Sequence, residues 1–253
     1  MPKLQSQSFL TRIHMLAKKM FNGDFSMSMV PSIYSEVNGM SIIHIDGIIG
    51  KKISKTEKDS GYIDIDDIVK SLKIAANADT QCVILCINSP GGSSTGIQEA
   101  GDVIKKLTEI KPVVTFCDTI CASAAYWLAS CTNGIFVTPS SEVGSIGVYA
   151  KVLDMSENLA MQGINIQIFS AGSMKTMGQG DKPLTEEECK FIQDDIDEQW
   201  MKFKTLVIEN RGLVEESTMQ GQLFSGEKAI DINLADEIVS DFDTFLSQVT
   251  TEM

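Results

Sequence analysis

Two serine motifs suggest nucleophilic chemistry but lack the partners that this chemistry needs. Ser94 lies at the centre of a G-x-S-x-G pattern between a predicted strand and a predicted helix. In the α/β-hydrolase arrangement such a serine depends on a histidine later in the chain, whereas His14 and His44, the only histidines, both precede it. Ser225 begins an S-x-x-K pattern without the companion motifs of the penicillin-binding type. Both serines are therefore predicted to be helix N-caps.

Ser123 is the third candidate nucleophile. It lies in Cys121–Trp127, at the start of a predicted helix that follows a buried strand, between residues small enough for close packing. A serine in this place is more often a cap or a packing residue, so the motif alone does not define a site. Gly91 and Gly92, however, follow another predicted strand, where glycines let backbone N–H groups point into a cleft, as an oxyanion hole requires. No P-loop lysine follows them, which argues against nucleotide binding.

A lysine is the remaining candidate for a general base, because no histidine follows Ser123. A lysine acts as a base only where burial lowers its pKa, since desolvation penalises the ammonium form. Lys175 lies in the otherwise uncharged segment 170–178, directly after a predicted strand over 164–169. The alternative for Lys175 is an ordinary solvated loop lysine.

An alternation of strands and helices must position these residues. Continuous apolar runs such as Cys82–Ile87 are typical of parallel strands that are covered on both faces. Thr185 and Glu188 form a capping box at the start of a helix that runs to about Asn210. The order of elements indicates an α/β layered fold with a mostly parallel sheet flanked by helices. Strands are predicted at 40–49, 82–87, 113–117, 134–137 and 164–169, helices at 64–76, 95–107, 122–130 and 185–210, and a last short helix and strand within 221–238.

The charge distribution divides the chain into a basic leader and an acidic body. The chain carries 21 basic and 34 acidic residues, and a net charge of −13 repels phosphate backbones, so no nucleic acid is expected as a partner. The first thirty residues instead hold four basic residues and one acidic residue. Apolar residues recur there at helical spacing, which predicts a helix over 9–20. They are Phe9, Ile13, Leu16 and Met20. This helix is either solvated, an interaction or assembly arm, or an amphipathic membrane contact.

The cysteine content and the hydropathy exclude further classes. Six cysteines lie mostly in apolar segments without C-x-x-C pairs or nearby histidines, which predicts free thiols in a reducing compartment and no metal site. No run approaches the roughly 18 apolar residues of a membrane span, and the leader lacks the apolar region of a secretory signal. We therefore expect a soluble chain that is not exported, with no integral membrane segment and no cofactor.

Five ordered segments resemble the serine–lysine peptidases of the signal peptide peptidase A type, which include phage head-maturation proteases and share a fold with Clp protease and the crotonases. Ser145 and Lys175 follow Ser123 by 22 and 52 residues, spacings that are typical of this family. One departure is Asn233, where the family usually has glycine, but asparagine tolerates the left-handed conformation that glycine would supply after a helix. The matching segments are Asn88–Gly92 (the glycine turn), Ala122–Ala129 (the nucleophile helix), Gly144–Val148 (G-S-I-G-V), Ala171–Lys175 (the base loop), and Gly221–Gly226 with Asp236 and Glu237 (the C-terminal motif).

The resemblance implies a role for each matched site residue. Ser123 would be the nucleophile and Lys175 the general base, while Ser145 would hydrogen-bond the lysine amine and hold it toward the nucleophile. The backbone N–H groups of Gly92 and Ala124 would form the oxyanion hole. The resemblance also implies a Clp/crotonase-like serine peptidase domain over residues 38–240, which leaves a leader helix and linker at 1–37 and a C-terminal tail at 241–253.

The implied activity is that of an ATP-independent serine endopeptidase that acts on protein or peptide substrates. The family resemblance suggests a ring-like homo-oligomer, in which the lysine of one copy could reach the serine of a neighbour. A soluble member with a short basic leader resembles the phage or prophage branch, which cleaves scaffold and other head proteins in the host cytoplasm or inside the procapsid. The alternatives are a soluble cellular member that degrades peptides, a non-catalytic scaffolding head protein of the same fold, and a crotonase-like acyl-CoA enzyme, which the G-S-I-G-V and lysine segments disfavour.

Overall fold

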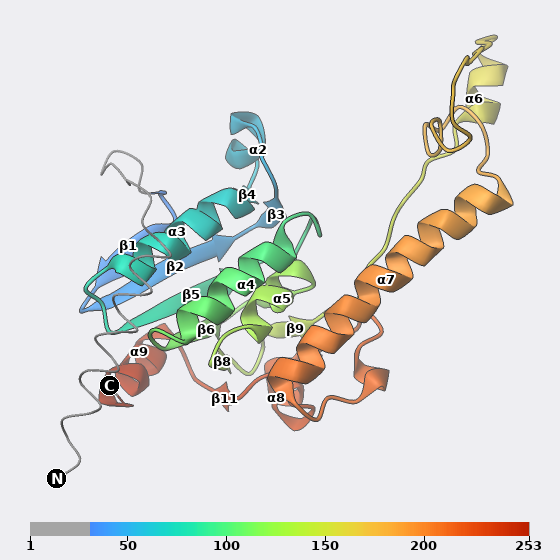
Figure 1. Ribbon diagram of the computed structural model, residues 1–253. Helices are drawn as coiled ribbons and strands as arrows, with labels where there is room; N and C mark the ends of the chain where they lie inside the picture. The colour runs from blue at the N-terminus through green and yellow to red at the C-terminus, as the bar shows by residue number, and fades with distance from the viewer. Residues whose placement is uncertain (1–30, 253) are drawn as a thin grey trace. The chain divides into compact units, whose positions relative to one another are not determined.

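The computed structural model describes residues 31–252, which divide into two compact units (Figure 1). The first unit combines the described residues up to Ile146 with those from Lys204 onward, and the second is Gly147–Phe203. The helix predicted at 9–20 lies outside the described residues. The predicted α/β class with a mostly parallel sheet is confirmed. None of the described helices is both long enough and apolar enough to cross a membrane.

A six-stranded sheet forms the centre of the first unit. Its neighbouring strands are parallel except at the β1–β2 edge. Residues 34–37, at the end of the stretch predicted as a linker, form β1 and pair with β2. The order across the sheet is β1 (Tyr34–Val37), β2 (Met40–Asp46), β5 (Cys82–Asn88), β6 (Val113–Cys117), β8 (Gly134–Val137) and β11 (Glu237–Ile238).

Helices cover both faces of this sheet. On one face lie α3 (Ile65–Asn77), α4 (Ile97–Thr108) and α5 (Ala124–Ser130), which pack against one another and against the strands (Figure 1). The other face is covered by α9 (Phe242–Glu252), which is formed by residues that the sequence assigns to a tail. Its Phe245 is fully buried and stacks on Phe116 with ring centroids 5.1 Å apart.

Two small sheets lie beside the main one. The first has the order β10 (Leu223–Ser225), β9 (Glu142–Gly144) and β7 (Ile120–Ala122). The second pairs β3 (Ile48–Gly50) with β4 (Tyr62–Asp64). Sequence patterning predicts a single strand over 40–49, but Gly47 adopts a φ of 96° and separates β2 from β3. The short helices α2 (Lys55–Asp59) and α8 (Gly226–Asp231) and a 3₁₀ turn at Glu216–Thr218 complete the first unit.

The second unit contains α6 (Ser156–Met161) and most of the long helix α7 (Glu186–Arg211), which continues into the first unit from Lys204. The predicted capping box of α7 is confirmed, because the Thr185 N–H donates to the Glu188 carboxylate at 2.8 Å and the Glu188 N–H donates to the Thr185 hydroxyl at 3.2 Å.

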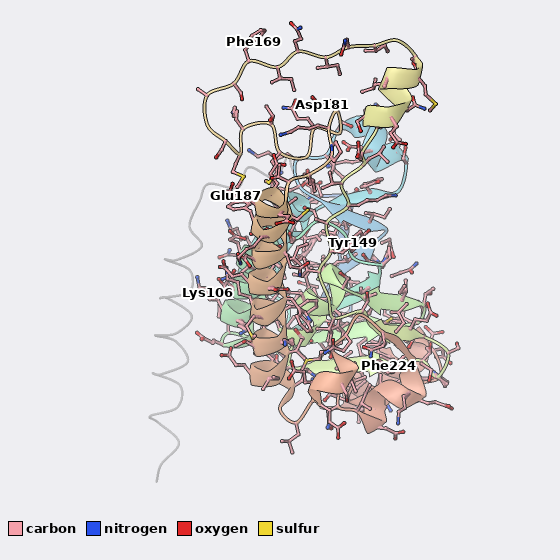
Figure 2. The ribbon with its side chains drawn as sticks, turned by 90° about the vertical axis from the view of Figure 1, so that its right-hand side faces the viewer. Lys106, Tyr149, Phe169, Asp181, Glu187 and Phe224 are labelled. Carbon is pink, nitrogen blue, oxygen red and sulfur yellow. The ribbon has the colours of Figure 1, made fainter. Side chains whose placement is uncertain are left out.

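The strand predicted at 164–169 is wrong for the single chain. Ile164, Ile166 and Ile168 alternate with polar residues, as in a half-buried strand, but this segment pairs with no other described segment. A strand forms only where a neighbour completes its hydrogen-bond ladder. The isoleucines are between 42% and 49% exposed, and Phe169 is 92% exposed at the tip of the loop (Figure 2).

Candidate active site

Ser123 lies at the tight turn that joins β7 to α5. Its φ of 52° and ψ of −124° fall in a region that residues with a side chain rarely adopt, at a cost of about 1–3 kcal/mol. It occupies the N-cap position of α5, yet its hydroxyl makes no capping hydrogen bond. A strained strand-to-helix turn with an uncommitted hydroxyl is the local geometry of a nucleophile elbow. The capping role that such a serine more often has is therefore not the one seen here.

Helix α5, which directly follows Ser123, is fixed by burial and hydrogen bonds. All seven of its residues are buried, and its first turn is closed by the Trp127 N–H, which donates to the Ser123 carbonyl at 2.9 Å. The Tyr126 hydroxyl donates to the Leu234 carbonyl at 2.9 Å. Leu234 follows Asn233, whose φ of 62° confirms the predicted left-handed turn after α8. The turn at Asn233 and Leu234 thus anchors α5, the helix that begins directly after Ser123.

Ser145 lies next to Ser123 because of how β7 and β9 pair. Ala122 and Gly144 are partners at the ends of these two parallel strands, so the two serines are the next residues along each. The Ser123 N–H donates to the Gly144 carbonyl at 2.8 Å. Ser145 has a φ of 51°, and its N–H donates to the Gln222 carbonyl at 2.6 Å. Neighbouring strands are about 4.8 Å apart, which places the two half-buried serines side by side.

The glycine turn after β5 packs directly on Ser123. Ser89 continues the ladder beside β7, because its N–H donates to the Ile120 carbonyl at 2.8 Å and its carbonyl accepts the Ala122 N–H at 3.1 Å. Two residues on, a methyl group at Gly91 would lie 2.7 Å from the Ser123 Cβ and 2.8 Å from the Ala124 nitrogen. Only glycine fits at this position.

The two predicted oxyanion donors, the N–H groups of Gly92 and Ala124, belong to the residues that directly follow Gly91 and Ser123. Ala124 is the first residue of α5, where a backbone N–H has no partner within its helix. Gly92 is exposed, with a φ of 154°, and a methyl group there would collide with the backbone of Ile49. The Ile49 N–H donates to the Gly91 carbonyl and its carbonyl accepts the Ser93 N–H, both at 2.8 Å. Strand β3 therefore holds the glycine turn in place.

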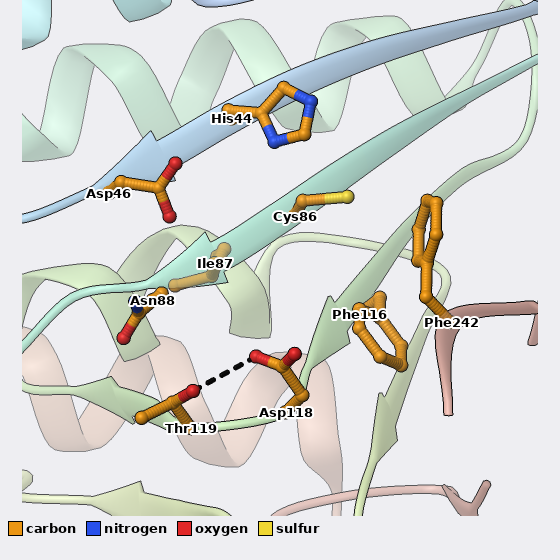
Figure 3. Close-up of a pocket in the computed structure, with 9 residues that line it drawn as sticks. All are labelled: His44, Asp46, Cys86, Ile87, Asn88, Phe116, Asp118, Thr119 and Phe242. Atoms are coloured by element: carbon orange, nitrogen blue, oxygen red, sulfur yellow. Dashed lines mark hydrogen bonds between the residues drawn. The ribbon is translucent and has the colours of Figure 1, made fainter. Parts of the chain in front are cut away.

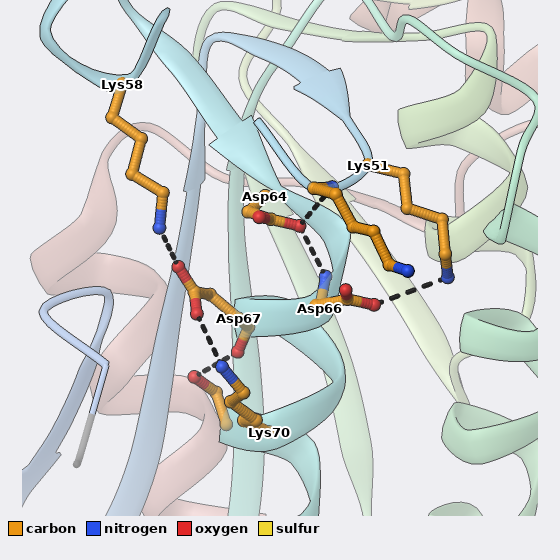
Figure 4. Close-up of polar contacts among 8 residues, drawn as sticks. Lys51, Lys58, Asp64, Asp66, Asp67 and Lys70 are labelled. Atoms are coloured by element: carbon orange, nitrogen blue, oxygen red, sulfur yellow. Dashed lines mark hydrogen bonds and ion pairs between the residues drawn. The ribbon is translucent and has the colours of Figure 1, made fainter. Parts of the chain in front are cut away.

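Strand β3 is itself fixed by charged groups at the start of α3 (Figure 4). The Asp64 carboxylate accepts the Lys52 N–H at 3.2 Å and, as N-cap, the Asp66 N–H at 2.9 Å. Lys51 forms an ion pair with Asp66 at 3.3 Å. Asp67 pairs with lysines of α2 and α3. These contacts connect the β3–β4 pair to the main sheet through α3.

Lys175 belongs to the second unit. Its side chain is exposed, and its N–H donates to the Gly172 carbonyl at 3.2 Å, which closes a turn. Within this unit Lys175 therefore does not have the burial that a lysine base needs. The residues that the structure brings together are Ser123, Ser145, Gly92 and Ala124.

The two alternative serine motifs differ in outcome. Ser225 is confirmed as an N-cap, since its hydroxyl accepts the Lys228 N–H at 3.3 Å. The prediction that Ser94 caps the next helix is wrong. Helix α4 begins at Ile97 with Gly96 as N-cap, so no side chain caps this helix. The left-handed conformation of Gly96, with a φ of 85°, delays the start of the helix beyond the reach of Ser94.

Cysteine chemistry does not compete with Ser123 in this part of the molecule. Burial, as the main cause, raises the pKa of Cys117 to about 12 and that of Cys121, beside the site, well above its usual value. Such thiols are neutral and unreactive. Among residues 31–252, no group of three or more His, Cys, Asp or Glu side chains is arranged to hold a metal ion.

The two adjacent glycines, which the sequence presents as one motif, have different roles in the structure. Gly91 is the residue in contact with Ser123, while Gly92 is exposed and lies against the backbone of Ile49. The contribution of Ile49 was missed, because it depends on a bridge between segments more than forty residues apart. The only local signal was the pair of adjacent glycines at the end of a buried strand.

We expect Gly91→Ala to reduce kcat/KM for peptide cleavage by about 10²-fold or more, because the new methyl group must displace Ser123 or the Ala124 N–H. Gly39→Ala is the matched control, since Gly39 also has a positive φ, 77°, but open space around it. Steady-state kinetics on both folded variants, checked by circular dichroism, measure the effect. Equal activity of the two variants would show that the contact between Gly91 and Ser123 has no catalytic importance.

Comparisons with known proteins show the family and the fold of this chain. The model of peptidase family S49 matches residues 105–252. The head-tail preconnector protein GP5 of Enterobacteria phage P21 is 30% identical over 86% of this chain and 44% of its own length. The capsid assembly protease C of Escherichia phage lambda is 27% identical over 92% of this chain and 54% of its own length. The chain thus spans about half the length of these relatives.

The family match covers more than half of the chain, and the chain therefore belongs to peptidase family S49. A solved structure, the N165D mutant of ClpP1 from Listeria monocytogenes, matches with a TM-score of 0.51 over 80% of this chain and 93% of its own, at 17% identity. This similarity shows the fold: the predicted Clp/crotonase-like architecture is confirmed.

Proposed function

We propose that this chain is a serine endopeptidase in which Ser123 is the nucleophile and Lys175 the general base. The observation that carries the proposal is the strained backbone of Ser123, whose hydroxyl caps no helix and which lies between Ser145 and the glycine turn. Strain of this kind persists only where the surrounding structure enforces it, and it is concentrated at functional sites.

The proposed reaction is acyl transfer through a covalent intermediate. The neutral amine of Lys175 takes the proton from the Ser123 hydroxyl, whose oxygen attacks the scissile carbonyl. The N–H groups of Gly92 and Ala124 stabilise the resulting oxyanion. The protonated lysine then donates its proton to the leaving amine, and the acyl-enzyme forms. A water molecule deprotonated by the same lysine releases the acid product, and no nucleotide is consumed.

Assembly of several copies is proposed to bury Lys175. Lys175 is exposed, and the neighbouring segment 164–169 has the pattern of a strand without a partner strand. A second copy that pairs with this segment would cover the exposed Ile164, Ile166 and Ile168. We propose a ring-like homo-oligomer in which the lysine loop is buried at a contact between copies and serves the Ser123 of a neighbour.

Mixing two inactive variants tests this arrangement. Ser123→Ala retains the lysine and Lys175→Ala retains the serine, so co-assembled copies contain some complete sites. We expect each variant alone to be inactive and the mixture to recover a measurable fraction of wild-type peptide cleavage. A mixture that co-assembles, as native mass spectrometry would show, but remains inactive would mean that each lysine serves its own chain.

The substrate class is proposed from the relatives. Two of them are named as phage head or capsid proteins, one of them as a capsid assembly protease. We propose that this chain cleaves scaffold or other head proteins during capsid maturation, in the host cytoplasm or the procapsid. Co-expression of the wild type or Lys175→Ala with the accompanying head proteins, followed by intact-mass analysis, tests this. Cleavage in the wild type alone supports the proposal, whereas uncut head proteins in both samples would favour a structural role.

A further inference from the structure

A cavity of about 380 Å³ opens at the carboxyl ends of β2, β5 and β6, on the face of the sheet that α9 covers (Figure 3). Helix α9 begins at Phe242 and packs over Met40, Ile42 and Ile84, the earlier parts of these strands. Toward the carboxyl ends of the strands, which α9 does not cover, the side chains of His44, Asp46 and Asn88 are exposed. The carboxyl ends of parallel strands are where α/β sheets usually bind their ligands.

The cavity combines an apolar floor with an acidic rim. Phe116, Phe242 and the half-buried Cys86 form the floor, and Asp46 and Asp118 lie at the strand ends (Figure 3). Burial, as the main cause, and the two carboxylates together raise the pKa of the Cys86 thiol to about 12, so both charges lie close to it. Neither carboxylate forms an ion pair with another described residue.

The chemistry of this cavity favours an occupant with positive charges beside apolar side chains. None of the described residues that line it is a lysine or an arginine, although His44 is among them. A metal ion is not the expected occupant, because no group of His, Cys, Asp or Glu side chains in the described part of the chain has the arrangement to hold one.

The chain itself contains a segment of this chemistry. Residues 1–30 hold four basic residues and only one acidic residue, in a chain whose net charge is −13. Within 9–20, apolar residues at helical spacing alternate with Arg12, Lys18 and Lys19. The apolar residues of this segment are suited to contact the apolar floor of the cavity, and its basic residues carry the charge opposite to that of the acidic rim.

The described chain lies close to the cavity near its start, at Ile33. The Ile33 carbonyl accepts the N–H of His44, one of the cavity residues, at 2.9 Å. Twelve residues separate Met20 from Ile33. At about 3.3–3.6 Å for each extended residue they span roughly 40 Å, more than enough to return to the cavity.

We propose that residues 9–20 dock into this cavity of their own chain, with basic residues against Asp46 and Asp118 and the apolar stripe over Phe116 and Phe242. This proposal goes beyond the peptidase activity and does not depend on it. A docked leader would cover the open half of the sheet face next to Asn88, from which the glycine turn of the candidate active site begins.

Photo-crosslinking in the full chain tests the proposal. The Ser123→Ala background keeps the leader intact whatever the activity of the protein, and p-benzoylphenylalanine replaces Leu16 in the apolar stripe. After irradiation, peptide mapping should locate the crosslink on peptides that contain Phe116 or Phe242. The same probe at Thr11, on the opposite side of the predicted helix, should give about fivefold less of this product. Mixing isotope-labelled and unlabelled copies should show crosslinks within one chain only.

Charge variants test the role of the acidic rim. Asp46→Asn with Asp118→Asn should lower the Leu16 crosslink about fivefold or more, as should high salt, because close ion pairs are lost. Glu99→Gln with Asp102→Asn, two exposed carboxylates on α4, is the matched control and should change nothing. Lys18→Glu with Lys19→Glu should also lower the yield, and adding Asp46→Lys with Asp118→Lys should restore it.

Three results would overturn the proposal. They are a Leu16 crosslink that maps outside the cavity, one that joins two different copies, and a yield that the charge variants leave unchanged.

Discussion

Ser123→Ala is expected to lower kcat/KM for peptide cleavage by roughly 10⁴–10⁶-fold, the range seen when a serine nucleophile is removed. The hydroxyl of Ser123 is the atom that would form the acyl-enzyme. The nearby Cys121 thiol cannot replace it, because that thiol is fully buried and burial raises its pKa. The fold should survive, because the serine side chain makes no capping bond that alanine would lose. Kinetics with a peptide substrate, alongside circular dichroism, provide the measurement.

Ser94→Ala is the matched control for this prediction. Ser94 is an exposed serine two residues after Gly92, in a pattern that resembles a nucleophile motif, but it caps no helix. We expect its loss to change activity by less than about twofold, since surface substitutions away from special features are close to neutral. If Ser94→Ala were inactive and Ser123→Ala active, the assignment of the nucleophile would be wrong.

Lys175→Ala is expected to lower kcat/KM by about 10²–10⁴-fold, the usual contribution of a general base. Added methylamine should restore part of the lost activity, because a small amine can enter the space that the side chain leaves and accept the proton. This rescue separates a catalytic lysine from one that only maintains assembly. The rate of peptide cleavage as a function of amine concentration is the measurement.

Lys190→Ala is the control in the same unit. Lys190 is also exposed, but it lies on α7 and forms an ion pair with Asp194 at 2.7 Å. An exposed pair of this kind contributes little, so we expect unchanged activity and no effect of the amine. The assignment of the base would fail if Lys175→Ala kept wild-type activity in the assembled protein.

The central sheet could be predicted from sequence because its strands are buried on both faces. Strands β6 and β8 begin and end where the apolar runs at 113–117 and 134–137 do, since a continuous apolar run has only one stable location in a covered parallel sheet. Helix α7 was predictable from its capping box, and the turn at Asn233 from the tolerance of asparagine for a left-handed backbone.

The elements that were missed or wrong depend on partners elsewhere in the chain or outside it. Strands β7 and β9 have three residues each, too few for a periodic pattern, and form because they pair with each other and, for β9, with β10. Segment 164–169 has the alternation of a strand, but no strand of the described chain lies alongside it. Hydrophobic periodicity indicates that a segment is suited to form a strand, but it does not show whether another strand is available to pair with it.

In the candidate site too, the sequence indicates individual residues, whereas their proximity depends on strands that are distant in the sequence. Motifs indicated Ser123 and Ser145 separately, and only the β7–β9 register shows that they are neighbours. Lys175 lies in the second unit, and the burial expected around it is not seen within that unit. The assignment of Lys175 rests on the order and spacing of motifs, and the amine-rescue experiment tests it.

Labelling with a fluorophosphonate probe tests the central claim most directly. The probe reacts only with a serine whose hydroxyl is activated, and peptide mapping by mass spectrometry identifies the residue that carries the adduct. The proposed mechanism predicts a single adduct on Ser123 in the assembled wild type, strongly reduced in Lys175→Ala and absent from Ser123→Ala. An adduct on another residue, or none on the assembled wild-type protein, would contradict it.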